Sequence, residues 1–340
     1  MKKQLSLAFT FCGCFLGAGF VSGQELWQFF GAFGGWGYLG LALAMGLTVL
    51  CGWLIFALAR RCSIRTMDRL IIPWERAGIL RRVIGVIQII FLLGIFMIMA
   101  AGAGALLRTL FGLPRWIGSL ALILLVGIAA LFGLGGLIRI FDILVPVLVG
   151  LTVLIGGTAL LRNGLSLPAP EPKNNPLLSN FFFSAVSFVC YNLFSALGVL
   201  LPLAHRSEKG WPLGVALGTA VLSLIGLSVL LPIGEYSTAE LPMLELAGSL
   251  HPALKYLYGL LLLAAMFAAG LTCLTGTLQF TPKPKATLPF CLALCFVGSM
   301  LGFGGLIGTV YPFFGYLSLF GIISMLIYFI RSKQHGTEKL

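Results

Sequence analysis

Charged residues are scarce in this sequence. Only 9% of its 340 residues are Asp, Glu, Lys or Arg, whereas a soluble domain carries about 25%. So few charges cannot cover a water-soluble surface, which excludes an ordinary soluble domain. Hydrophobic residues make up 59% of the chain, and its mean hydropathy is +1.05. The composition therefore predicts an integral protein of the lipid bilayer.

Motifs for nucleotide-driven or catalytic chemistry are also missing. No Gly-x4-Gly-Lys-[Ser/Thr] loop occurs, which excludes the usual phosphate site of a nucleotide-driven pump. The three histidines, His205, His251 and His335, are too scattered to make a metal site. No His/Asp cluster falls at membrane depth, which argues against an intramembrane enzyme. We therefore expect no catalytic residues and no cofactor except a coupling ion.

The eight cysteines and the excess of basic residues need no special function. Nearly all cysteines fall inside apolar runs, which favours packing over a disulfide framework. The net charge of +12 could suggest nucleic acid. However, the basic residues form short clusters between long apolar runs, as orientation signals do. We expect a small solute and the bilayer as partners, and no nucleic acid.

Apolar runs of roughly 20 residues, the length that spans a bilayer, predict about ten membrane helices. The first run imitates a secretory signal peptide, but the hydrophobic stretch resumes at once, so we expect it to stay as the first helix. The predicted ranges are 5–31, 36–59, 82–107, 115–133, 140–161, 178–203, 211–233, 252–279, 287–303 and 306–330.

Basic residues predict the orientation of these helices. With the N-terminus inside, most of them fall in cytoplasmic segments. The outer segments keep only Arg108, Arg115, Arg162, Lys173 and Lys255. This asymmetry indicates a multi-pass protein of the cytoplasmic membrane with both termini in the cytoplasm.

A proline-rich segment divides the chain into two halves of five helices. Residues 1–162 form the first half, residues 163–177 form an external linker, and residues 178–340 form the second half with a short cytoplasmic tail. Because five is odd, the second half enters the membrane in the opposite orientation. That arrangement is an inverted repeat, which is common in secondary transporters.

Two other loops are longer than turns. Residues 67–74 form a short amphipathic piece suited to the membrane interface. Ser237 and Glu240 have the spacing of a capping box and precede a predicted outer helix at 241–247. That helix is compatible with a moving lid and with a static cap.

The strongest functional signal lies inside the first membrane helix, where Gly17, Gly19 and Gly23 make a poor helix. Peptide groups released from a helix in lipid need other partners, so such a stretch survives where it lines a cavity. A tight helix crossing with a neutral Glu25 is the alternative. The polar neighbours favour a broken-helix site, so the predicted substrate residues here are Gly17, Ala18, Gly19, Ser22, Gly23 and Gln24.

The run Gly17-Ala18-Gly19-Phe20-Val21-Ser22-Gly23-Gln24-Glu25 resembles the first-helix signature of the YkvI-like uncharacterised membrane proteins. That family is placed in the amino acid–polyamine–organocation transporter superfamily. The resemblance covers the whole chain in length and span count and includes the segment 242–247. It implies a LeuT-type fold of five-plus-five inverted repeats. It also implies that helices 1 and 6 are broken around an alternating-access site.

The sixth predicted helix has a polar centre that fits this expectation. Tyr191 and Asn192 mark the place where the backbone would open, and Ser195 follows one turn later. We predict that these three residues bind substrate, because an amide both donates and accepts and a tyrosine adds a ring with a hydroxyl. Ordinary hydrogen bonding between membrane helices is the alternative interpretation.

The eighth predicted helix bears on the coupling ion. In sodium-coupled members of the superfamily, a carbonyl and two hydroxyls here complete a sodium site, and Ala269 and Thr272 match that spacing. The second hydroxyl position is Cys273, and a thiol is a poor ligand for a hard ion. Sodium and a proton carried by Glu25 therefore both remain candidates, because a dry cavity disfavours a charged carboxyl.

Two functions fit these observations. The first is an ion-coupled secondary transporter, such as a symporter, for a small organic solute, with an amino acid as one candidate. The second is a membrane-embedded receptor or assembly subunit that uses the same fold without net transport. Flux in proteoliposomes separates the two, because a receptor binds its ligand without accumulating it.

Overall fold

The structure, a computed structural model, describes residues 2–62, 64, 70, 78–132, 137–163, 175–207, 210–279, 281 and 284–335. These ranges contain helices and no strand. The helices of the first half are α1 (Lys2–Gly13), α2 (Ala18–Ser22), α3 (Gln24–Phe29), η1 (Gly31–Phe33), α4 (Gly35–Arg61), α6 (Gly78–Phe111), α7 (Arg115–Phe132) and α8 (Leu137–Asn163). Those of the second half are α9 (Phe181–Arg206), α10 (Trp211–Leu230), η2 (Gly234–Tyr236), α11 (Pro242–Leu250), α12 (Pro252–Gln279), α13 (Pro284–Ser299) and α14 (Phe303–His335).

Among the described residues, seven helical segments are long and apolar enough to cross a membrane. They are Gly35–Arg61, Gly78–Phe111, Leu144–Arg162, Phe181–His205, Trp211–Leu230, Pro252–Gln279 and Phe303–Ile330. Shorter apolar helices occupy Gln4–Gly13, Arg115–Leu131 and Pro284–Ser299. Large apolar side chains on the outside, such as Leu161 at 88% and Phe320 at 73% exposure, suit contact with lipid. The chain is therefore a multi-pass membrane protein.

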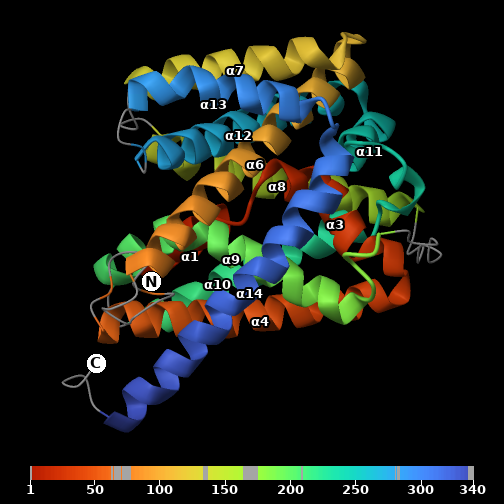
Figure 1. Ribbon diagram of the computed structural model, residues 1–340. Coiled ribbons are helices and arrows are strands. Elements are labelled where there is room, and N and C mark those ends of the chain that lie inside the picture. The colour runs from red at the N-terminus through yellow and green to blue at the C-terminus, as the bar shows by residue number, and fades with distance from the viewer. Residues whose placement is uncertain are drawn as a thin grey trace.

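The long helices fall into two packed groups. In one group α6 packs against α7, α12 and α13, and α7 packs against α12. In the other group α4 packs against α9 and α10, and α1 packs against α10. Figure 1 shows α7, α13 and α12 as one layer and α4, α9 and α10 as another.

Two further helices connect these groups. The long helix α14 crosses the molecule in Figure 1 and packs against α9, α6, α4 and α3. The helix α8 packs against α10, α12 and α1. The short helices α2 and α3 contact members of both sets, including α12, α10 and α9, as well as α14. They therefore lie where the two groups meet.

The prediction that the sixth helix opens at Tyr191 and Asn192 is wrong in this structure. Helix α9 runs without interruption through both residues, and Asn180 caps its start by accepting from two backbone amides. The Asn192 amide donates to the Phe188 carbonyl at 3.1 Å, and the Ser195 hydroxyl donates to the Asn192 carbonyl at 2.7 Å. Bonds within the helix therefore satisfy these polar groups without any unwinding.

The predicted outer helix at 241–247 exists as α11, but its predicted capping box is wrong. Leu241 stands at the cap position and supplies no side-chain hydrogen bond. Glu240 instead forms an ion pair with Arg115 of α7 at 2.9 Å. Apart from Leu70, the amphipathic piece at 67–74 lies outside the described residues, and so do residues 164–174 of the predicted linker.

The contact between α6 and α7 supplies a test of the fold. A Cβ at Gly118 would lie 2.5 Å from the Ala103 carbonyl oxygen and 2.9 Å from the Gly104 Cα. Gly118→Ala should therefore lower the free energy of unfolding in detergent by about 1–3 kcal/mol, the usual cost of overpacking. Gly85→Ala in α6 is the control, because its Cβ meets nothing within 4 Å. Equal stability of the two variants would contradict this packing.

Candidate functional site

The backbone leaves the helical conformation near the start of the chain. Helix α1 ends at Gly13, α2 begins at Ala18, and Gly23 separates α2 from α3. Gly23 has a φ of 86°, in the left-handed region that favours glycine. The Gly17 amide donates to the Phe15 carbonyl at 2.9 Å. The glycines of the sequence motif therefore lie where the chain turns out of one helix and into the next.

Side chains satisfy the carbonyls of this interrupted segment. The Ser22 hydroxyl donates to the Gly19 carbonyl at 3.1 Å. Tyr258 of α12 is fully buried, and its hydroxyl donates to the Val21 carbonyl at 2.8 Å. The hydroxyls of Tyr258 and Thr152 lie 3.0 Å apart. Helices α8 and α12 are thereby joined to α2 at the interruption.

Glu25 lies in the first turn of α3 with only 2% of its surface exposed. The Tyr191 hydroxyl of α9 donates to its Oε1 atom. A Cβ at Gly19 would lie 2.7 Å from Glu25 Oε2. The carboxyl group therefore fills the space that this glycine leaves open.

Aromatic rings surround this carboxyl. The rings of Tyr191 and Tyr311 stack with centroids 4.4 Å apart and an interplanar angle of 11°. Phe29 and Phe188 lie 5.6 and 5.8 Å from the Tyr191 ring. The site thus combines one acid with four aromatic rings from α3, α9 and α14.

Glutamine side chains of α3 contact a glycine-rich face of α14. A Cβ at Gly304 would lie 2.9 Å from Gln24 Nε2, and one at Gly308 would lie 2.8 Å from Gln28 Oε1. The Gln28 amide donates to the Gly304 carbonyl at 2.9 Å. The Oε1 atom of Gln24 is buried and has no hydrogen-bond partner. The glycines of α14 therefore make room for polar side chains beside Glu25.

The structure does not bring all the predicted site residues together. Gly19 and Tyr191 meet at the Glu25 carboxyl, whereas Asn192 bonds to the Phe188 carbonyl within α9. Ser195 also bonds within α9. On α12 the Thr272 hydroxyl donates to the Ala268 carbonyl at 2.9 Å, and Ala269 and Thr272 are half-buried. No described hydrogen bond joins these two α12 residues to the interrupted segment.

Several site residues were missed by the sequence reasoning. Tyr258, Thr152 and Tyr311 each belong to a long apolar helix, where a single hydroxyl is a weak signal. Gly304 and Gly308 have helical spacing on α14, and that spacing was the signal available for a close contact with another helix.

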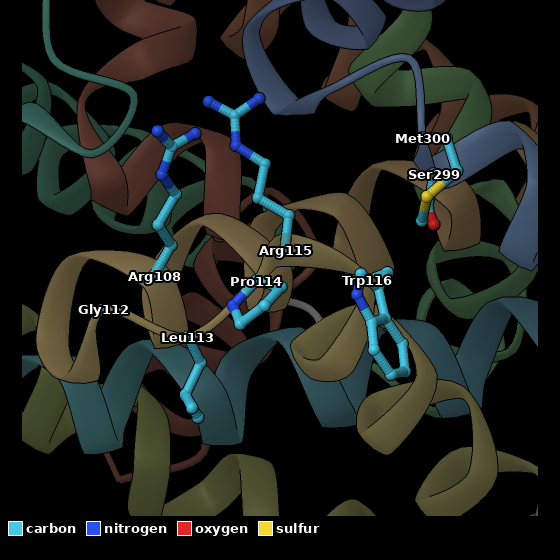
Figure 2. Close-up of a pocket in the computed structure, with 8 residues that line it drawn as sticks. All are labelled: Arg108, Gly112, Leu113, Pro114, Arg115, Trp116, Ser299 and Met300. Carbon is cyan, nitrogen blue, oxygen red and sulfur yellow. The ribbon is translucent and has the colours of Figure 1, made fainter.

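The surface also has a pocket that is separate from the Glu25 site. Its volume is about 490 Å³, and it lies where the α6–α7 turn meets the turn before α14. Figure 2 shows Arg108 and Arg115 extending to one side of it and Leu113 and Trp116 to the other. Its lining residues are Arg108, Gly112, Leu113, Pro114, Arg115, Trp116, Ser299 and Met300. None of them belongs to the Glu25 site.

Two curated proteins of Bacillus subtilis (strain 168) are similar to the whole chain. The uncharacterised membrane protein YkvI is 29% identical over 332 residues, which cover 92% of each chain. The uncharacterised protein YyaD is 26% identical over 346 residues, covering 94% of this chain and 95% of YyaD. No family model matches the chain. The resemblance to YkvI-like proteins is confirmed.

Solved transporter structures share the fold. The inward-facing conformation of Mhp1 matches with a TM-score of 0.64 and 14% identity, covering 97% of this chain and 77% of Mhp1. A variant of the Eremococcus coleocola manganese transporter matches with a TM-score of 0.59 and 14% identity, covering 96% of this chain and 78% of that one. At this level of identity, the comparison shows a LeuT-type fold and nothing of the cargo.

Tyr258 supplies a test of the interrupted segment. Tyr258→Phe removes the donor to the Val21 carbonyl and the partner of Thr152. A lost buried hydrogen bond of this kind costs about 1–3 kcal/mol. We expect a lower free energy of unfolding and faster hydrogen exchange at residues 17–23. Tyr256→Phe is the matched control, because Tyr256 is 53% exposed. The same exchange rate in both variants would show that Tyr258 does not hold this segment.

Proposed function

From its homology to YkvI and the fold it shares with LeuT-type transporters, we propose that the chain is a secondary active transporter of a small organic solute. The observation that carries the proposal is the Glu25 carboxyl, buried beside an interrupted helix and touched by α9. An interrupted helix and an acid where two groups of helices meet form a site that opposite rocking motions can expose in turn.

We place about ten membrane-crossing helices in this architecture, with residues 1–162 and 178–340 as the two inverted halves. The three shorter apolar helices supply the spans beyond the seven long ones. In a five-plus-five repeat, α1 corresponds to α9 and α4 corresponds to α10. The contact of α4 with α9 therefore has a counterpart in the contact of α10 with α1, and both pairs pack extensively. This correspondence supports a five-plus-five repeat. The basic residues support a cytoplasmic membrane location with both termini inside.

The proposed substrate contacts are the interrupted segment and the facing part of α9. They comprise Gly17, Ala18, Gly19, Ser22, Gly23, Gln24, Tyr191, Asn192 and Ser195. Packing of α3 against α9 and α14 supports this assignment. In this arrangement the backbone of the segment supplies donors and acceptors, and the rings of α9 and α14 supply apolar walls.

We assign coupling to a proton at Glu25 rather than to sodium. Ala269 and Thr272 were the candidate sodium ligands, but the Thr272 hydroxyl bonds within α12. The neighbouring position is a cysteine, which is a poor ligand for sodium. A carboxyl group needs no further ligands to carry a proton, and burial favours its neutral form.

Vesicle transport tests this proposal. Purified protein in proteoliposomes is screened with labelled amino acids and amines under an imposed pH gradient. We expect wild type to accumulate a solute against its gradient, and Glu25→Gln to lose this accumulation, because an amide carries no exchangeable acid proton. Glu235→Gln is the control, since Glu235 is exposed. Saturable binding without accumulation by wild type would identify a receptor instead and overturn the proposal.

A further inference from the structure

Glu25 is the one charged residue among the buried side chains that the structure describes. The ion pairs found in the described part of the chain are Arg115 with Glu240 and Lys255 with Glu245, both at partly exposed positions. No described basic side chain pairs with Glu25. An ionised carboxylate is costly in such a place unless a positive charge or a proton neutralises it.

The groups around the carboxyl cannot supply that positive charge. From α9 it meets the Tyr191 hydroxyl, which is a neutral donor. From α14, Tyr311 stacks on the Tyr191 ring and is also neutral. Of the other titratable groups near the interruption, Tyr258 of α12 donates to the Val21 carbonyl, and the Cys14 thiol donates to the Thr10 carbonyl at 3.2 Å. No described residue supplies the neutralising charge, which leaves a proton or a cation from solution to supply it.

The remaining features of the site favour an organic cation over an anion. Phe29, Phe188 and Tyr311 pack around the Tyr191 ring, whose hydroxyl donates to Glu25, and aromatic π systems attract ammonium groups. The buried Gln24 Oε1 atom is an acceptor without a partner, and an N–H group would satisfy it. A substrate carboxylate would instead meet Glu25 with no described basic residue to receive it.

We propose that the cargo is a small amine in its cationic form without a carboxylate, and that it replaces the proton on Glu25. This inference rests on the proposed transporter function and names its substrate class. The carboxyl releases its proton to solvent as the ammonium group binds, and no covalent bond to carbon forms or breaks. Because the proton and the ammonium group bind the same carboxyl, they cannot both be bound at once. The transporter therefore exchanges protons for amines rather than carrying both in one direction.

Matched pairs of probes test the substrate class. Cadaverine and lysine, agmatine and arginine, phenethylamine and phenylalanine, and choline and betaine each differ by a carboxylate. Binding to purified wild-type protein is measured by calorimetry in lightly buffered detergent solution with a pH indicator. We expect at least one amine to bind, its carboxylated twin to fail, and about one proton to leave per amine, as linkage at a shared carboxyl requires.

Two glutamate variants test whether the Glu25 carboxyl binds the amine. Glu25→Gln should weaken amine binding about tenfold to a hundredfold, the worth of a charge-assisted hydrogen bond, and should abolish proton release. Glu235→Gln should bind as wild type does. If Glu25→Gln does not fold, binding of the paired probes to the wild-type protein still tests the substrate class. Binding of the carboxylated twins, binding of no probe, or amine binding without proton release would overturn the inference.

The binding assay tests the cargo class and the flux assay tests transport, so either one can fail while the other succeeds. Amine binding with proton release but without flux would keep the cargo class and reject transport. Accumulation of a carboxylated solute would keep transport and reject the amine.

Discussion

A buried carboxyl group with no counter-charge among the described residues constrains the rest of this structure. Glu25 of α3 is held by a tyrosine of α9 and lies against a glycine of α2, so α2, α3 and α9 meet at its side chain. Burying an uncompensated charge is expensive, and its neutral or paired state therefore decides which packing is stable. In the proposed transporter, a binding event at this carboxyl acts directly on the contact between α3 and α9, because Tyr191 of α9 donates to it.

The interrupted backbone beside the carboxyl has a second requirement. Peptide groups that leave a helix in an apolar environment need partners, and here they come from side chains of distant helices. The Tyr258 hydroxyl connects the Val21 carbonyl to Thr152 of α8. The left-handed Gly23 then restarts the chain as α3 with Glu25 in its first turn. The interrupted segment between α1 and α3 is thus stabilised at a few positions. Such an arrangement suits a segment that changes conformation without unfolding.

Composition and hydropathy were enough to predict the helical membrane class and most helix positions, because lipid contact demands long apolar runs. The run from Gly17 to Glu25 was recognisable because glycines and an acid conflict with an ordinary membrane helix. The same reasoning failed for the opening at Tyr191 and Asn192, since Asn192 bonds within its own helix and the Tyr191 hydroxyl bonds Glu25 of α3, and neither bond needs an opening. Tyr258 was not predictable, because its partner depends on how α12 is rotated against α2.

Reaction of Glu25 with a carbodiimide tests the central claim most directly. Dicyclohexylcarbodiimide attacks protonated carboxyls in apolar surroundings, and peptide mass spectrometry locates the product. The account predicts modification of Glu25 at a rate that falls as the pH rises, protection by a bound amine, and no modification of the exposed Glu235. An unreactive Glu25, or a reaction that neither pH nor amines affect, would contradict a carboxyl that exchanges a proton for a cation.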